Sequence, residues 1–149
     1  MVASRSDVAS TGVLAASLSE IVREALGAGE IDRLLATVDR RLEDASLESL
    51  HAETRLEQAC HAILGCAVIG LRVHGLRTVD RPGHHVVALE SLADTVGVTL
   101  DRIDYFQTLR NKDLYTGSAH VSASQVAEAR QLASDTRRWL ASRGSRAAG

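Results

Sequence analysis

The sequence predicts an all-α fold, an up-and-down antiparallel bundle of four to five helices. Three observations lead to this prediction. Apolar residues make up 45% of the 149 residues but aromatic residues only 3%, so the core must consist of Leu, Val, Ile and Ala. Proline occurs once, at Pro82. Apolar residues recur at the three- and four-residue spacing of amphipathic helices, with no strand pattern of note.

The ends of the chain lie outside the predicted domain. Residues 1–12 are polar, and we expect them to be disordered, like the tail of residues 143–149. A single helical domain therefore covers residues 13–142, a length that suits one domain. Its first element is expected to be a short helix over Ala15–Leu26, which the glycines that follow would end.

The next segment contains the predicted centre of the bundle. A helical apolar stripe begins at Ile31, and the sequence leaves open whether this helix breaks near Ser46 or continues. One long helix is expected over Ser49–His74. Its second half is apolar nearly all round, which is typical of a helix enclosed by others. Gly75 is a plausible residue to end it.

Two further helices are predicted after a turn at Asp80–Gly83, where Pro82 suits a first helical turn. One helix covers residues 84–96 and ends at Gly97. The other covers Leu100–Leu114, with Thr99 as its cap.

The last helix has a clear start. Ser122 and Gln125 have the spacing of a capping box, and Val121 and Val126 that of a hydrophobic staple. This helix is expected to run to about Ser142. Arg137 and Arg138 would then lie near its end and complement the helix dipole.

Charge and cysteine content exclude several classes of protein. The net charge of −2 argues against a nucleic-acid binder that works by bulk charge, although a local arginine cluster remains possible. Cys60 and Cys66 would project about 120° apart on one helix, so we expect two buried, reduced thiols rather than a disulfide or a zinc site. The most apolar stretch, Ala62–Leu71, is too short to span a bilayer. We expect a cytoplasmic protein without a membrane partner, cofactor or metal.

Arg110 is the unexpected residue of the sequence. On a helical wheel it falls about 20° from Ile103 and within the apolar stripe of its helix. Arginine is rarely buried without a partner. Three alternatives stay open: the side chain reaches water from the end of the stripe, it pairs with a carboxylate such as Glu57 or Glu90, or it lines a cleft and binds an anion.

Two polar residues follow Arg110 closely. Asn111 is adjacent, and Tyr115 lies five positions further on, where the helix is expected to end near Leu114. The three side chains are therefore predicted to converge at a helix end beside the loop "TGSAH". Such a place suits a phosphate or a partner.

The order of these features resembles the HEPN superfamily, in particular small prokaryotic HEPN proteins whose motif ends in Tyr. The resemblance covers residues 49–140: a long apolar helix, "PGHH" opening a second, "RNKDLYTG" ending a third, and "VSASQVAEARQLASDTRRWL" as a fourth. It implies a helical bundle that forms a homodimer. It also implies a toxin–antitoxin or phage-defence system, RNA as a ligand, and a nucleotidyltransferase-type antitoxin partner.

Many HEPN proteins are metal-independent ribonucleases with an Arg, a polar residue and a His four to six residues further on. Arg110 and Asn111 match this motif, and Tyr115 takes the place of the His. Tyrosine titrates near pH 10 and is a poor base at pH 7, whereas histidine can accept or donate a proton there. We therefore expect an RNA-binding or protein-interaction domain that is catalytically weak or inactive.

Two alternatives to this function are kept. One is a metal-independent endoribonuclease toxin with Arg110 and Asn111 in a site at the dimer interface, which would need His84, His85 or His120 to fold in. The other is a structural helical scaffold. A metal site at His84 and His85 is disfavoured, because adjacent helical positions point about 100° apart.

Overall fold

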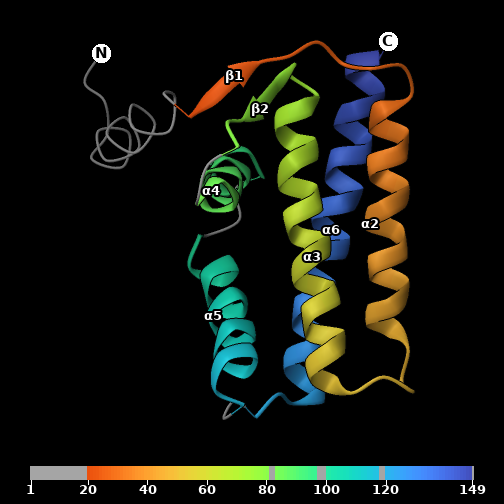
Figure 1. Cartoon of the computed structure of the whole chain (residues 1–149). Helices are drawn as coiled ribbons and strands as arrows, with labels where there is room; N and C mark the ends of the chain where they lie inside the picture. Colours follow the sequence, from red (N-terminus) through yellow and green to blue (C-terminus); the bar gives the residue numbers. More distant parts are fainter. Residues whose placement is uncertain (1–19, 81–82, 97–99, 118–119, 149) are drawn as a thin grey trace, which may run out of the picture.

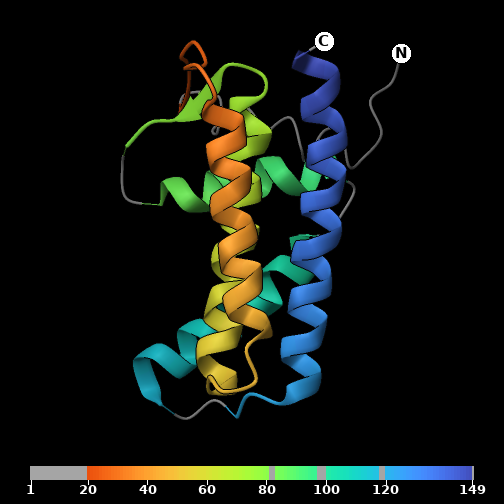
Figure 2. The ribbon, with the colours of Figure 1, turned by 90° about the vertical axis from the view of Figure 1, so that its right-hand side faces the viewer.

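Helix follows helix along the part of the chain that the structure, a computed structural model, describes: residues 20–80, 83–96, 100–117 and 120–148. Its elements are, in chain order, β1 (Ile21–Arg23), α2 (Glu30–Ser46), α3 (Ala52–Arg72), β2 (Leu76–Thr78), α4 (His84–Val96), α5 (Leu100–Thr116) and α6 (Ala123–Ala148). Helices α2, α3, α5 and α6 alternate in direction along the long axis, and α4 runs across them (Figures 1 and 2). The predicted all-α bundle is confirmed.

The core is centred on α3, which packs against all four other helices. Ten residues of α3 are buried, and nine of them are apolar. Each large aliphatic side chain removed from water contributes roughly 1.5–3 kcal/mol, so this helix supplies much of the driving force for folding. The prediction of a central helix is confirmed. Helix α2 approaches it closely at Gly65, where a Cβ atom would stand 2.8 Å from Cγ2 of Val38.

A small antiparallel ribbon of β1 and β2 closes one end of the bundle (Figure 1). It pairs Ile21 with Thr78 and Arg23 with Leu76. The predicted helix over Ala15–Leu26 is wrong for residues 20–26, while residues 15–19 lie outside the described part. The local apolar spacing allowed a helix, but pairing with a distant strand satisfies the same backbone groups.

Arg72 holds this ribbon to the bundle. Its guanidinium is 5% exposed and all three nitrogens donate hydrogen bonds. Nε and Nη2 bind the carboxylate of Glu30 at 2.6 and 3.2 Å. Nη1 and Nη2 also bind the backbone carbonyls of Glu24, Leu76 and Ala25 at 2.9, 3.2 and 3.0 Å. One side chain thus binds backbone carbonyl groups of the segment between β1 and α2 and of strand β2.

The helix ends partly follow the predictions. Helix α2 ends at Ser46 and α3 begins at Ala52. The helix therefore breaks near Ser46, one of the two alternatives that the sequence left open. Gly75 has a φ of 69°, as expected of a residue that ends a helix. Pro82, Gly97 and Thr99 lie outside the described residues, as do residues 1–12.

The capping box that opens α6 is confirmed. Ser122 N donates to Gln125 Oε1 at 2.9 Å, and Gln125 N donates to Ser122 Oγ at 3.1 Å. Val121 and Val126 are both buried, as a staple requires.

The far end of α6 differs from the prediction, because the helix continues to Ala148 through most of the expected tail. Arg137 therefore lies well inside the helix. It pairs with Asp39 of α2 through two hydrogen bonds of 2.8 and 2.9 Å instead of complementing the dipole. In the described ranges, no helix is long and apolar enough to cross a bilayer.

Candidate functional site

Arg110 lies on the inner side of α5, as its place in the apolar stripe predicted. Ile103 and Phe106 of that stripe are 1% and 2% exposed, and Arg110 is partly buried beside them. Its Nη1 donates to Gln107 Oε1 at 3.2 Å. Its Nε is buried and makes no hydrogen bond with any described residue. A buried guanidinium N–H without an acceptor is costly, typically about 1–3 kcal/mol.

The expected carboxylate partner of Arg110 is absent from the described residues. Glu57 and Glu90 were the predicted candidates, and neither forms an ion pair with it. The alternative in which Arg110 is neutralised inside its own bundle by one of these two residues is therefore wrong.

Asn111 and Tyr115 do not join Arg110. Both are exposed, and Tyr115 has 80% of its surface in contact with solvent. At about 100° per residue they lie some 40° from each other and at least 100° from Arg110 around the helix. Helix α5 also continues to Thr116, beyond the predicted end, and Gly117 follows it with a φ of 61°. The predicted convergence of three side chains at a helix end is wrong.

Two histidines from other helices lie within the electrostatic influence of Arg110. His61 comes from α3 and His85 from α4. Burial lowers the pKa of His61 from 6.5, and the positive charge of Arg110 lowers it further. The pKa of His85 is lowered by burial, by His84 and by Arg110. Both imidazoles are therefore neutral at pH 7, although the negative charge of Glu57 acts in the opposite direction on His61.

His61 shares the unusual feature of Arg110. Its Nδ1 is buried without a hydrogen-bond partner among the described residues. The neighbouring thiol of Cys60 is satisfied, because Sγ donates to the carbonyl of Phe106 on α5 at 3.6 Å. Burial raises the pKa of Cys60 to about 12, so this thiol is inert at neutral pH. Cys60 and Cys66 are both free and buried, as predicted.

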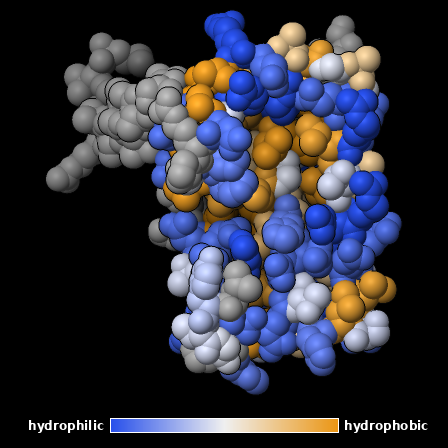
Figure 3. Space-filling view, in the orientation of Figure 1, coloured by the Kyte–Doolittle hydropathy of each residue, from blue (hydrophilic) through white to orange (hydrophobic). Residues whose placement is uncertain are grey.

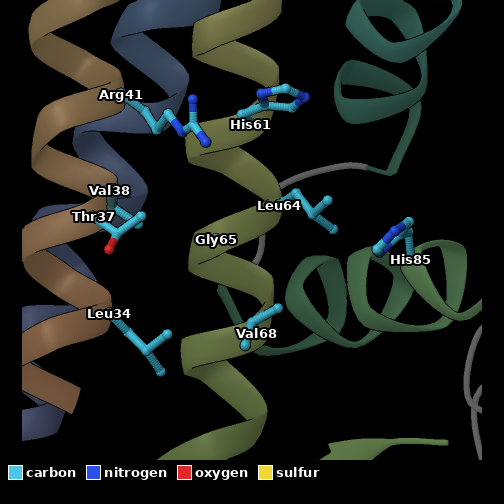
Figure 4. Close-up of a pocket in the computed structure, with 9 residues that line it drawn as sticks. All are labelled: Leu34, Thr37, Val38, Arg41, His61, Leu64, Gly65, Val68 and His85. Carbon is cyan, nitrogen blue, oxygen red and sulfur yellow. The ribbon is translucent and has the colours of Figure 1, made fainter. Parts of the chain in front are cut away.

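A hollow opens on the α2 side of His61. Its volume is about 320 Å³, and nine residues of α2, α3 and α4 line it (Figure 4): Leu34, Thr37, Val38, Arg41, His61, Leu64, Gly65, Val68 and His85. Figure 3 shows apolar side chains exposed in the middle of this face, between hydrophilic surroundings. Arg41 reaches from α2 toward α3 (Figure 4), where its Nη1 donates to Gln58 Oε1 at 3.1 Å.

The remaining histidines lie elsewhere or pair with each other. The rings of His84 and His85 contact each other at a tilt of 38°, with centroids 3.9 Å apart, and Nδ1 of His84 lies 3.5 Å from Thr78 Oγ1. His120 is exposed on the segment before α6. No three His, Cys, Asp or Glu side chains in the described part of the chain come together as metal ligands would.

Sequence reasoning named Arg110 and His85 but missed Arg41 and the role of His61. A signal for both was present. Leu34, Thr37, Val38 and Arg41 have the i, i+3, i+4, i+7 spacing of one helix face, and His61, Leu64, Gly65 and Val68 repeat it. The pattern predicts one such face on each of the two helices, but it does not predict that both faces line the same hollow.

Comparisons of the chain with models of protein families, with curated proteins and with solved structures found no match.

Proposed function

We propose that this chain is an RNA-binding domain of the HEPN type, in which Arg110 contacts a backbone phosphate. The observation that carries the proposal is the unsatisfied guanidinium. Arg110 is partly buried, its Nε has no acceptor, and no described carboxylate neutralises it. A phosphate oxygen supplies both the acceptor and the negative charge, and arginine binds phosphate with well-defined geometry.

The surroundings of Arg110 support an anionic ligand. Arg41 lies near enough to His61 for its charge to lower the pKa of that ring, as the charge of Arg110 also does. Asn111 and Tyr115 lie on the neighbouring outer face of α5. The exposed ring of Tyr115 is suited to stacking on an unpaired base. In this proposal RNA crosses the edge of α5, with a phosphate at Arg110 and a base at Tyr115.

The proposal includes the assembly that the HEPN resemblance implies. The chain would act in the cytoplasm as a homodimer, beside a nucleotidyltransferase-type antitoxin. Light scattering of the purified protein tests the first part, and co-purification with the product of a neighbouring nucleotidyltransferase gene tests the second.

Fluorescence anisotropy with a labelled single-stranded RNA tests the binding itself. Arg110→Gln is expected to weaken binding about fivefold to tenfold and to reduce the salt dependence of log Kd by about one phosphate contact. Arg102→Gln is the matched control, because Arg102 is an exposed arginine of the same helix. Equal losses in the two variants would mean that only general charge matters, and unchanged binding in both would refute the proposal.

A metal-independent endoribonuclease is the second candidate, and the two imidazoles whose pKa values Arg110 lowers favour it. In such a reaction a histidine removes the proton of the 2′-hydroxyl, whose oxygen then bonds to phosphorus. The P–O5′ bond breaks, and a protonated group donates to the leaving 5′-oxygen. Arg110 would stabilise the charge of the intermediate phosphorane. The lowered pKa values make His61 and His85 able to accept a proton at pH 7 but poor donors. This favours binding over efficient cleavage.

Incubation of labelled RNA with the protein and a chelator separates the two candidates. Binding alone leaves the RNA intact. Cleavage to a 2′,3′-cyclic phosphate that is lost in Arg110→Gln and in His61→Gln would establish the nuclease instead.

A further inference from the structure

The hollow between α2, α3 and α4 lies beside the close contact of α2 with α3. The α2 face presents Leu34 and Val38, and the α3 face presents Leu64 and Val68. Between them Gly65 has no side chain, and the helices come so near that a Cβ atom there would lie 2.8 Å from Cγ2 of Val38. Leu34, Leu64 and Val68 remain partly exposed beside this contact, so the hollow has an apolar floor. Its volume of about 320 Å³ is at the lower end of the range for small-molecule sites.

Among the residues that line this floor, Arg41 alone is charged at pH 7, because both imidazoles are neutral there. Arg41 stands at the rim and forms no ion pair with a described carboxylate. His61 and His85 are the other ionisable residues that line the hollow, and no acidic residue lines it. Thr37 is already engaged, since its hydroxyl donates to the carbonyl of Arg33 and accepts from Arg40 Nη2. His61 has a buried Nδ1 that lacks a partner, so hydrogen bonding is incomplete at this end.

We propose that the hollow binds a small organic anion, a molecule with an apolar body and a single acidic group. The body packs on the floor of Leu34, Val38, Leu64 and Val68, and the carboxylate, sulfonate or phosphate pairs with Arg41. Charge complementarity favours an anion over a cation or a neutral molecule, because Arg41 brings a positive charge to the rim and no acidic residue lines the hollow. The size favours a small molecule over a helix, whose diameter with side chains is about 10 Å.

This inference stands apart from the RNA-binding proposal. Arg110 does not line the hollow, and the ligand is recognised by an apolar body that an RNA backbone lacks. Either proposal can therefore fail while the other holds.

Fluorescence titration with 8-anilinonaphthalene-1-sulfonate tests the inference, because this probe has the proposed chemistry and becomes bright in apolar sites. Saturable binding to the wild-type protein is expected. Arg41→Gln should weaken it about fivefold, a change typical of losing one partly exposed charged contact. Thr37→Trp should weaken it at least tenfold, because an indole at this exposed rim position would cover the floor. Arg138→Gln removes an arginine of α6 that is likewise exposed and lies outside the hollow, and it should leave the affinity unchanged.

Competition experiments with the bound probe test whether the hollow prefers a negatively charged ligand to a positively charged one. Octanoate should displace the probe, whereas octylammonium, with the same chain length, should not. The proposal is overturned if the two compete equally, or if Arg41→Gln and Thr37→Trp bind the probe like the wild type while circular dichroism shows all variants folded. It is also overturned if the probe is expelled as the protein self-associates, since a second copy would then cover the hollow.

Discussion

Two arginines on the inner faces of this bundle have opposite surroundings. Arg72, at the end of α3, is 5% exposed and donates five hydrogen bonds, two of them to the carboxylate of Glu30. Arg110, on α5, has one hydrogen bond to Gln107 and a buried Nε with no described acceptor. The chain thus builds a complete set of partners for one guanidinium and leaves the other incomplete.

The difference separates a structural role from a functional one. A buried charge with all its acceptors in its own chain holds segments together, since removing it leaves several groups unsatisfied. A partly buried guanidinium with one acceptor contributes little to folding, and in the proposed function a phosphate supplies the acceptor that its Nε lacks. The predictions below test this contrast, from the largest expected effect to the smallest.

Substitution of the two arginines by methionine should give opposite results. Arg72→Met is expected to lower the free energy of unfolding by about 3 kcal/mol, because three backbone carbonyls and Glu30 lose their donor. Arg110→Met should change it by less than about 1 kcal/mol, because it removes an unsatisfied N–H and keeps the apolar stem. Urea denaturation measures both. Equal losses would show that Arg110 is structural too.

Two glycines of α3 should also respond in opposite directions. Gly65→Ala is expected to cost about 1–3 kcal/mol, because its Cβ would lie 2.8 Å from Cγ2 of the stiff side chain of Val38. Gly70→Ala is the matched control. The nearest atoms there are at 3.9 and 4.0 Å, so the higher helix propensity of alanine should stabilise the protein by about 0.5–1 kcal/mol. If both variants are stabilised, α2 and α3 do not pack as closely as described.

Loss of the ion pair between α2 and α6 is expected to change the free energy of unfolding by less than Arg72→Met and by about as much as the upper limit given for Arg110→Met. Arg137 and Asp39 are partly exposed at 26% and 46%, and they form two hydrogen bonds. Arg137→Gln should cost about 1 kcal/mol, and a double-mutant cycle with Asp39→Asn should assign most of it to the pair. Arg138→Gln, at a position 74% exposed, should cost less than about 0.5 kcal/mol. A coupling near zero would show that the pair adds nothing.

The smallest effects concern the dependence of stability on pH. The histidines His61 and His85 and the carboxylate of Glu30 should contribute to it in different pH ranges. The pKa values of His61 and His85 are lowered from 6.5 in the folded chain, so the unfolded chain takes up protons first. Stability is therefore full above about pH 7 and falls as the pH decreases through 6.5 toward the folded pKa values. The pKa of Glu30 is lowered from 4.5 by its hydrogen bond to Arg72, so its contribution is lost only below pH 4.5.

Thermal unfolding between pH 8 and pH 3.5 measures both steps. His61→Gln should flatten the decrease between pH 7 and pH 5 and leave the decrease below pH 4.5 unchanged. Glu30→Gln should do the reverse. If His61→Gln alters only the lower range, the described environment of this ring is incorrect.

Much of the fold could be predicted because it depends on local patterns. The central helix, α4, α5 and the capping box at Ser122 follow from apolar spacing and from side chains that bond within four residues. The predictions failed where distant contacts replaced local ones. Residues 21–23 form a strand because they pair with β2. Arg137 was expected to interact with the dipole of its own helix, but it binds Asp39 of α2.

The candidate site divides in the same way. The place of Arg110 on an apolar stripe follows from the helical period alone, as does the pattern of the two faces that line the hollow. The period also places Asn111 and Tyr115 away from Arg110, which the predicted convergence did not take into account.

The sequence by itself determined that the chain is helical, where its central helix lies and which arginine is out of place, because each of these depends on neighbours three or four residues away. Only the tertiary structure decided what that arginine faces. The packing of α3, α4 and α5 places Arg110 near enough to His61 and His85 for its charge to lower their pKa values, although these residues are far apart in the chain, and no local period encodes which faces meet.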